Sequence, residues 1–464
     1  MKRRYGLVMG IGLLLALGGS TCGCGVQSTI EPTPQSEITQ ITLTDEPDLA
    51  ATQPATPGEP TANLGRLAYV QDGDIWVRAL PGGDARRLTD DGQNTSPRWS
   101  PSGEWLTFHR GDDVWLMRSD GTDAHCVSPA SIRDCAWSPV DDRLAYGAGR
   151  TTLCIIEPDE LAAASPQGEG HVLLQAAINE EPLTTIKNLA WSPDGRRLAY
   201  VLQSGQLGGL PDRVSIGTTD LESGPREIYA APSPPQDGLI TAGWAPDGQA
   251  LLFWRELLFS ASGAADGLPL ELVPLDGGEP VLIADVSPLH PDYWSASPTG
   301  ETVALTVGSG RETWTNKRIA LADLKTADLD HLTDESVSAC SPAFSPDGQQ
   351  IAYVAAPDIG HVWGGEEAKV GVAQRRIWVM NADGSNPRPL TGDPAYRDER
   401  PQWSADGSHI LFARMNASGH ASLWLIDVTE DTPARVVDRL APAPEWFGTY
   451  GHIDWDQFFD WWNT

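Results

Sequence analysis

Eight polar residues recur along the chain at steps of 38 to 59 residues, each three positions before a Trp or a residue that replaces one. They are Ser96, Asp134, Asn188, Thr241, Tyr293, Ser341, Arg400 and His452. Equivalent positions of a repeat come together when the repeats close into a ring. We therefore predict that Asp134, Asn188, Tyr293, Arg400 and His452 line a channel mouth and bind a polar ligand or peptide. The alternative is a water-filled channel that only requires polar walls.

A second group of candidate binding residues lies in the segment 355–375, a long connection between two expected strands. It contains Asp358, His361, Trp363 and Glu366. Long loops on a rigid scaffold are where binding residues concentrate. We predict that this loop contributes to the same binding face.

Motifs for catalysis or metal binding are missing from the sequence. There is no G-x-S-x-G, H-E-x-x-H, P-loop, EF-hand or C-x-x-C pattern, and the nine His are scattered singly. We therefore assign no catalytic residue, no metal site and no cofactor. An enzyme whose residues are dispersed over the repeats stays open, with its site at the channel mouth.

The elements that must position these residues are strands joined by tight turns. The clearest copy is Trp191-Ser192-Pro193-Asp194-Gly195, followed by the apolar run 197–201. Pro presets the turn and Gly takes its left-handed position, so each copy predicts a hairpin. Further copies begin at Trp99, Trp137, Trp244, Phe344 and Trp403, with weaker ones at Ala296 and Trp455. Two more strands per copy give the four-stranded blade of a propeller.

The repeat resembles a known family. The W-S-P-D-G hairpin, the strand 377–379 (I-W-V), the Asp383-Gly384 turn and the closing Leu390-Thr391 are similar to the propeller repeat of TolB, the periplasmic component of the Tol system. They also resemble the propeller of prolyl-oligopeptidase-type peptidases. The resemblance covers about residues 64 to 460 and implies an all-β propeller of eight four-stranded antiparallel blades. Seven blades is the alternative, if the copy at Ala296 or the last one is not a true blade.

The first blade lacks its innermost strand, because the run 67–70 matches the second strand of the other copies. The segment 451–455 lies one repeat after Trp403. We predict that it supplies the missing strand, so that the C-terminus closes the ring and no sheet edge stays open toward the channel.

The chain divides into three parts. Residues 1–24 resemble a bacterial lipoprotein signal, with Lys2 to Arg4 before an apolar stretch and Cys22 or Cys24 as the lipidated residue. Gly19 or Thr21 stands where that pattern has Leu; ordinary signal cleavage is the alternative. Residues 25–63 form a Thr/Pro/Ser-rich tether that we expect to be disordered. Residues 64–464 form the propeller.

Charge and cysteine content limit the partners. A net charge of −31 argues against binding nucleic acid or anionic lipid, which both need basic patches. Among Cys126, Cys135 and Cys154 one disulfide is conceivable in an exported protein, and free thiols are the alternative. We expect a monomer at the bacterial cell envelope, in the periplasm or on the outer surface, attached to the membrane only by its lipid.

The sequence favours a non-catalytic binding or scaffold protein that uses the long-loop face of a propeller to bind a protein or peptide, or a glycan. The alternative is a glycan lyase or hydrolase, or a peptidase-related propeller, with its site at the channel mouth. No hydrolase domain follows the propeller, which argues against a complete prolyl-oligopeptidase-type peptidase.

Overall fold

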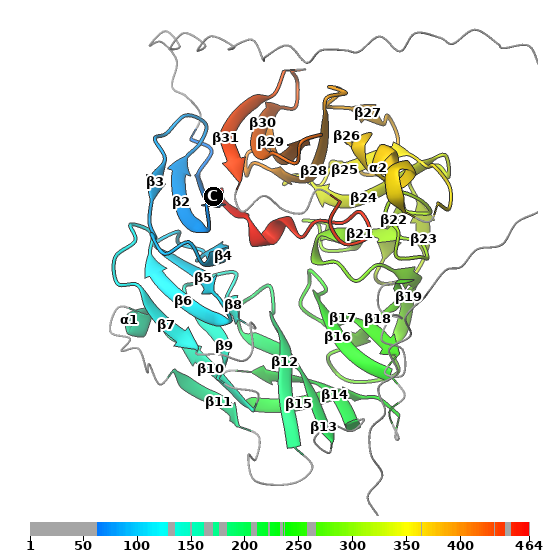
Figure 1. The fold of residues 1–464 in the computed structure, drawn as a ribbon. Helices are drawn as coiled ribbons and strands as arrows, with labels where there is room; N and C mark the ends of the chain where they lie inside the picture. Colours follow the sequence, from blue (N-terminus) through cyan, green and yellow to red (C-terminus); the bar gives the residue numbers. More distant parts are fainter. Residues whose placement is uncertain are drawn as a thin grey trace, which may run out of the picture. The chain divides into compact units, whose positions relative to one another are not determined.

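The computed structural model describes residues 63–128, 135–148, 151–161, 170–175, 183–205, 211–220, 223–232, 235, 237–257, 266–362, 364–430, 432–440 and 447–463. Residues 60–464 form one compact unit. Its strands build eight four-stranded antiparallel sheets that follow one another around a ring, as Figure 1 shows. The predicted eight-bladed propeller is confirmed. Among the described residues, no helix has the length and apolar character needed to span a membrane.

Within each blade the strands are called a to d from the centre outward. They follow the order of the chain in blades 2 to 8, whereas strand a of blade 1 comes from the C-terminus. Blades 1 to 4 consist of β32 (Phe459–Trp462), β1 (Arg66–Gln71), β2 (Asp74–Ala79) and β3 (Arg86–Arg87); β4 (Asn94–Trp99), β5 (Trp105–Arg110), β6 (Asp113–Arg118) and β7 (His125–Ser128); β8 (Cys135–Trp137), β9 (Leu144–Ala148), β10 (Thr152–Ile156) and β11 (His171–Gln175); and β12 (Leu183–Trp191), β13 (Arg197–Gly205), β14 (Pro211–Asp220) and β15 (Gly224–Ala230).

Blades 5 to 8 repeat the arrangement. They consist of β16 (Asp237–Trp244), β17 (Ala250–Leu257), β18 (Leu268–Pro274) and β19 (Val281–Ser287); β20 (Trp294–Ala296), β21 (Thr302–Val307), β22 (Arg318–Asp323) and β23 (Leu329–His331); β24 (Val337–Phe344), β25 (Gln350–Pro357), β26 (Arg376–Asn381) and β27 (Arg388–Pro389); and β28 (Tyr396–Trp403), β29 (His409–Asn416), β30 (Ala421–Asp427) and β31 (Ala434–Leu440). The weak copy at Ala296 is therefore a complete blade, and the seven-bladed alternative is wrong.

Strand b is apolar along its length because neighbouring blades cover both of its faces. In β13, the four residues from Leu198 to Val201 are all buried. The repeated Trp joins blade to blade, since the indole of Trp191 donates to the carbonyl of Ala136 and that of Trp244 to Ala190, both at 2.9 Å. The core is thus a series of layers between adjacent sheets.

The a–b turns have the predicted chemistry. In blade 4, the Ser192 hydroxyl donates to Asp194 at 2.6 Å and accepts the backbone N–H of Arg197 at 2.9 Å. Gly195 closes the turn with φ 65°. In an antiparallel blade the a–b and c–d turns share one face, which we call the turn face. The b–c and d–a connections share the opposite one, the long-loop face.

The C-terminus closes blade 1, as predicted, but with a different segment. Strand a is β32, in which Trp461 pairs with Leu67 just as Trp191 pairs with Leu198 in blade 4. The predicted strand 451–455 is therefore wrong. Trp455 instead begins the short 3-10 helix η3 (Trp455–Gln457), where its indole is buried beside a carboxylate. The sequence offers two Trp six positions apart, and only the second fits the register of β1.

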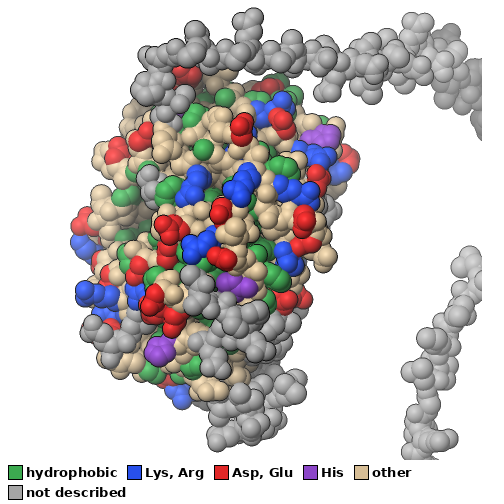
Figure 2. All heavy atoms as spheres, turned by 90° about the vertical axis from the view of Figure 1, so that its left-hand side faces the viewer, with side chains coloured by type: hydrophobic (Ala, Val, Ile, Leu, Met, Phe, Trp, Pro, Cys, Tyr) green, Lys and Arg blue, Asp and Glu red, His purple; other side chains and the backbone are tan. Residues whose placement is uncertain are grey.

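In the described part of the chain, two α-helices lie between strands. The connection of blade 7 contains α2 (Gly365–Ala373), and blade 3 contains the single turn α1 (Pro158–Leu161). Ala368 and Val372 of α2 pack on Trp314 of the neighbouring blade-6 connection. On the side of the molecule shown in Figure 2, acidic and basic side chains are interspersed.

Candidate functional site

The C-terminal residues 447–458, here called the crossing segment, run along the long-loop face before the chain enters blade 1 (red in Figure 1). The backbone N–H of Thr313 in the blade-6 connection donates to the carbonyl of Tyr450 at 3.0 Å. Phe447 packs on Trp314 with ring centroids 5.4 Å apart. A Cβ on Gly451 would lie 2.6 Å from the Thr313 hydroxyl and 3.2 Å from Trp314, so only Gly fits there without displacing a neighbour. The segment is thus fitted closely to the connections of blades 6 and 7.

A buried ionic network holds the crossing segment from below. Arg375 donates to the Glu399 carboxylate at 2.5 Å, to the carbonyl of Gly451 at 2.6 Å and to the hydroxyl of Thr313 at 2.6 Å. The other Glu399 oxygen accepts the indole N–H of Trp455 at 2.8 Å. Burial alone raises the pKa of Glu399, but the guanidinium groups of Arg397 and Arg375 outweigh it, and the net pKa is lowered. The carboxylate therefore stays ionised and paired, as a buried charge must be.

A histidine–aspartate pair lies next to this network. His452 Nε2 is 3.0 Å from the Asp292 carboxylate, which belongs to the short 3-10 helix η2 (Pro291–Tyr293) between blades 5 and 6. Burial lowers the pKa of His452, but the Asp292 charge and hydrogen bond outweigh it, and the net pKa is raised. His290 stacks on His452 with centroids 3.7 Å apart. Burial and then the His452 charge lower the pKa of His290 to about 3.

Tyr293 completes this group. It is 1% exposed, and its ring meets that of His452 edge-on at 5.2 Å. Arg400 donates to Asp456 of the crossing segment at 2.8 and 3.0 Å. The structure thus brings together three of the predicted channel-mouth residues, Tyr293, Arg400 and His452, and it does so through the crossing segment. We call these three residues with His290 and Asp292 the channel-mouth cluster.

The other predicted positions have a different explanation. Four members of the polar series share a left-handed backbone with φ between 52° and 57°, and they are Ser96, Asn188, Ser341 and Arg400. Each lies within a register shift of strand a, so the series marks a β-bulge. Small polar residues such as Asn and Ser tolerate this conformation better than bulky apolar ones. Asp134 lies outside the described residues.

The predicted residues of the blade-7 connection have mixed positions. The Asp358 carboxylate accepts hydrogen bonds from the Thr315 hydroxyl and the Asn316 backbone, both at 2.7 Å, and so joins the connections of blades 6 and 7. His361 is exposed. Glu366 is exposed in the first turn of α2 and pairs with Lys369 at 2.8 Å. Trp363 lies outside the described residues. Asp358 is therefore structural, whereas His361 and Glu366 are exposed at the surface.

Sequence reasoning missed several members of the site. Asp292 and His290 precede the polar position Tyr293, but nothing in their local sequence indicates a partner at His452. Arg375 follows α2, and its link to Gly451 joins residues 76 positions apart. In the described part of the chain, no group of three or more His, Cys, Asp or Glu side chains is placed to hold a metal ion. Cys126, Cys135, Cys154 and Cys340 are free thiols, so the conceivable disulfide is not formed.

Sequence comparisons find short similarities. No protein-family model matches the chain. Coronin-7 of Pongo abelii is 31% identical over 136 residues, which cover 27% of this chain and 13% of that protein. The Tol-Pal system protein TolB of Rhizorhabdus wittichii is 39% identical over 69 residues, 15% of this chain and 14% of TolB. The chain thus spans only a small part of each relative's length.

The solved structures similar to this chain include a peptidase propeller and a putative TolB. The dipeptidyl peptidase 4 of Porphyromonas gingivalis has a TM-score of 0.56 at 12% identity, over 82% of this chain and 60% of that one. A putative TolB from Agrobacterium tumefaciens has a TM-score of 0.34 at 21% identity, over 58% and 84%. The neighbours of this chain thus include both predicted types of propeller, TolB and peptidase. These similarities concern the fold and do not transfer an activity.

Proposed function

We propose that the chain is a non-catalytic, extracytoplasmic binding or scaffold protein that holds a protein or peptide on its long-loop face. The observation that supports this most directly is that the ionisable residues of the candidate site are engaged in holding the crossing segment. Arg375, Glu399, His452 and Asp292 fix the crossing segment to the connections of blades 6 and 7. The result is a rigid surface built from loops, which is the usual architecture of a binding site on a stable scaffold.

This surface, which we call the loop platform, comprises residues 308–316, 358–362, 364–375 and 447–452. Two of its apolar side chains are exposed, Val370 at 60% and Tyr450 at 42%. Arg311 lies over the Tyr450 ring at 5.2 Å and pairs with Asp266 at 2.7 Å. An exposed aromatic ring beside Arg is a composition that interface centres favour.

The relatives suggest where such a partner is found. One is a component of the Tol-Pal system by name, and the N-terminal segment of this chain reads as a lipoprotein signal. We therefore propose that the propeller is held at the bacterial envelope through Cys22 or Cys24, and that its partner is an envelope protein or peptide.

Photo-crosslinking tests this proposal. A benzoylphenylalanine is introduced at Val370 and, as the matched control, at Val140, which is 54% exposed in an a–b turn on the turn face. Cells carrying the full chain should give a discrete adduct from position 370 and none from position 140. Tyr450→Asp in the same chain should abolish the adduct. Adducts of equal yield from both positions, or none from position 370, would overturn the assignment of the loop platform.

The enzyme alternative is kept because the channel-mouth cluster places His452, Asp292 and Tyr293 within contact distance. A carboxylate beside a His, with a Tyr against the ring, is an arrangement that acid–base catalysis can use. If this function is correct, turnover of peptides or acidic oligosaccharides by the purified chain should be lost in both Tyr293→Phe and His452→Asn. Turnover that is equal in these variants and in the parent excludes a site at the channel mouth.

A further inference from the structure

We propose that the turn face carries a second docking site, a polar trough across blades 7, 8 and 1 that receives an extended, Lys- or Arg-bearing segment of a partner protein. The trough lies on the face opposite the loop platform, so this inference goes beyond the proposed function. It rests on the shape of the trough, on the side chains that line it and on the positions of three carboxylates.

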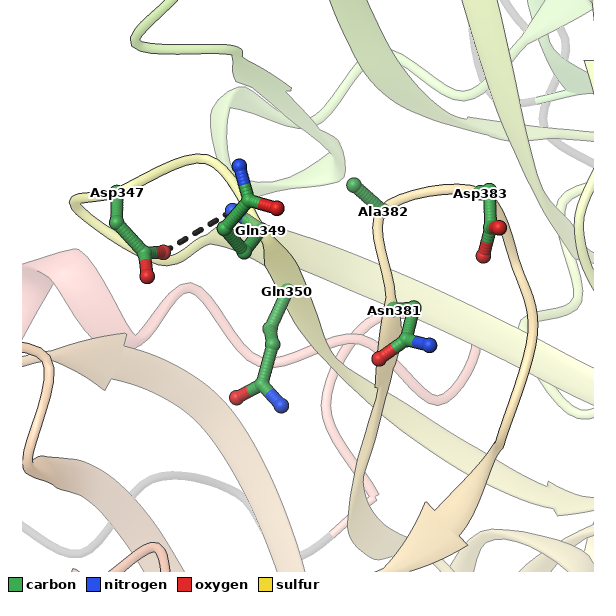
Figure 3. A pocket seen from close by; sticks show the side chains of 6 residues that line it. All are labelled: Asp347, Gln349, Gln350, Asn381, Ala382 and Asp383. Carbon is green, nitrogen blue, oxygen red and sulfur yellow. Dashed lines mark hydrogen bonds between the residues drawn. The ribbon is translucent and has the colours of Figure 1, made fainter.

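The trough consists of three adjoining hollows of about 620, 330 and 300 Å³. The first lies between the a–b turn and the c–d turn of blade 7 (Figure 3). The second shares Asp347 and Gln350 with the first and reaches the a–b turn of blade 8. The third shares Asp406 with the second and ends at Asn63 and Asn463, where the ring closes. Shared residues make the three hollows one continuous path, which suits an extended chain better than a compact ligand.

The side chains lining the trough fit a polypeptide with positive side chains. Asp347, Asp383 and Asp406 line it, and none of its lining residues is Lys or Arg. In Figure 3, Gln350 and Asn381 lie between the turns that carry Asp347 and Asp383. Amides such as these can donate to and accept from the backbone of a bound strand. The carboxylates can pair with Lys or Arg, so the trough and its occupant have complementary charge.

Each of the three carboxylates is held in place by hydrogen bonds within its own turn. One oxygen of each accepts hydrogen bonds within its own turn: Asp347 from the Ser345 hydroxyl at 2.6 Å, Asp406 from the Ser404 hydroxyl at 2.6 Å and Asp383 from the Ser385 backbone at 2.9 Å. The second oxygen of Asp347 and that of Asp406 accept no hydrogen bond from the described residues. A cation can therefore bind a positioned oxygen without breaking an internal contact, which avoids an ordering cost.

The same hydrogen bonds keep these groups charged. The Ser345 hydroxyl lowers the pKa of Asp347, and the side chain and then the backbone of Ser385 lower that of Asp383. Hydrogen bonds from Ser404 and Ser408 lower the pKa of Asp406 to about 2. The three groups are thus carboxylates throughout the physiological range of pH.

Other turns of this face supply matched controls. Asp120, Asp194 and Asp247 are exposed turn carboxylates of blades 2, 4 and 5, and each accepts a backbone hydrogen bond two residues on. None of them lines the trough. Replacing them by Asn changes the net charge of the face by the same amount as replacing the trough carboxylates. The comparison therefore separates a specific site from general attraction to an acidic face.

The test measures fluorescence anisotropy of the full chain with a labelled (Lys-Gly)5 peptide, against (Glu-Gly)5. The triple variant Asp347→Asn, Asp383→Asn, Asp406→Asn keeps the turn acceptors and should weaken binding about tenfold or more, while the triple variant at Asp120, Asp194 and Asp247 should weaken it less than about twofold. Gln349→Lys, which adds a cation at the rim, should also weaken binding, and it checks the site without touching a turn carboxylate.

Three results would overturn the proposal that the trough is a docking site. Equal weakening by both triple variants would show general electrostatic attraction only. Equal binding of the acidic peptide would exclude charge complementarity. The trough would be a cation site instead if three observations came together. Calorimetric titration would show tight binding of CaCl2 to the parent chain, the trough variant would lose this binding, and the basic peptide would not bind. Photo-crosslinking at Val370 is independent of all three results, so the two sites are tested separately.

Discussion

At the residue scale, the channel-mouth cluster contains ionisable groups whose effects on stability have opposite signs. His452 has a raised pKa, so its pairing with Asp292 is fully present below about 6.5, the unfolded value, and is lost as the pH rises through the folded value. His290 has a pKa lowered to about 3 and must stay neutral in the fold. Below about pH 6.5 the unfolded chain takes up a proton at this position that the folded chain does not. The free energy of unfolding therefore decreases as the pH is lowered.

The first prediction concerns His290. His290→Phe keeps a ring against His452 but removes the titrating group. Thermal melts between pH 7 and pH 4 should show a shallower loss of stability than the parent, with a difference on the order of 1–3 kcal/mol at pH 4. Parallel curves for the parent and the variant would contradict a neutral, buried His290.

The second prediction concerns the pair itself. His452→Gln can still hydrogen-bond Asp292 but carries no charge. The variant should lose more stability relative to the parent at pH 6 than at pH 9, because the ionic contact is present only while His452 is protonated. Asp292→Asn should show the same pH trend, and a deficit that is larger at pH 9 would contradict the assignment.

At the element scale, the a–b turns both reverse the chain and pack one blade on the next. Gly195 has φ 65°, and a Cβ at this position would lie 2.4 Å from Val140 and 2.9 Å from Ser138, both in blade 3. Backbone conformation and contact between blades therefore both exclude a larger residue. Gly111 has a similar φ of 62° but no atom within 4 Å of the added Cβ.

The third prediction uses these two glycines as a pair. Both Gly195→Val and Gly111→Val impose the cost of a left-handed β-branched residue, about 1–3 kcal/mol. Gly195→Val should lower the melting temperature further, because it also displaces Val140. Equal melting temperatures would show that the turn does not contribute to packing between blades. Anisotropy measured well below the melting transition should show that (Lys-Gly)5 binding survives in both variants.

At the scale of the whole molecule, the ring is closed by a strand from the far end of the chain. β32 pairs with β1, and Phe459 and Trp461 join the apolar cluster between blades 8 and 1. The crossing segment that leads to it is fixed separately by Arg375 and Arg400. Closure of the ring by β32 and attachment of the crossing segment are therefore distinct contributions to stability, and truncations can separate them.

The fourth prediction follows from this separation. A chain ending at Phe458 keeps the crossing segment but lacks β32, whereas a chain ending at Trp462 keeps both. Removing the strand exposes the backbone edge of β1 and the apolar groups beside it, which should cost several kcal/mol, a large part of a typical domain's stability. The shorter chain should be cut by protease in blades 1 and 8 under conditions where the longer one resists. Equal resistance would show that closure does not depend on β32.

The fifth prediction concerns the attachment of the whole molecule. If residues 1–24 direct lipidation, the double variant Cys22→Ser, Cys24→Ser should move from the membrane fraction to the soluble fraction. A variant with Cys126→Ser serves as the control, because this thiol lies in β7 of the propeller. Retention of the double variant on carbonate-washed membranes would contradict a lipid anchor.

The sequence determined whatever depends on local chemistry. Trp-Ser-Pro-Asp-Gly and its variants specify a turn through Pro, Asp and a left-handed Gly, and the runs beside it specify strands. Because each copy carries its own signal, the repeat alone predicted the hairpins, the eight blades and closure by the C-terminus. The same locality explains the error at the end of the chain. Trp455 lies one repeat after Trp403 and was predicted as the repeated Trp, but pairing with Leu67 selects Trp461.

The tertiary structure decided the site, because its contacts join residues that no local pattern relates. His452 and Asp292 are 160 positions apart and meet only because the crossing segment passes over blade 6. Four of the polar positions before the repeated Trp mark a β-bulge, and a sequence pattern does not distinguish such a bulge from a predicted binding ring. The trough likewise needs two turns of blade 7 and one of blade 8 at one place. Spacing along the chain specifies each turn, while the curvature and register of the ring decide which turns become neighbours.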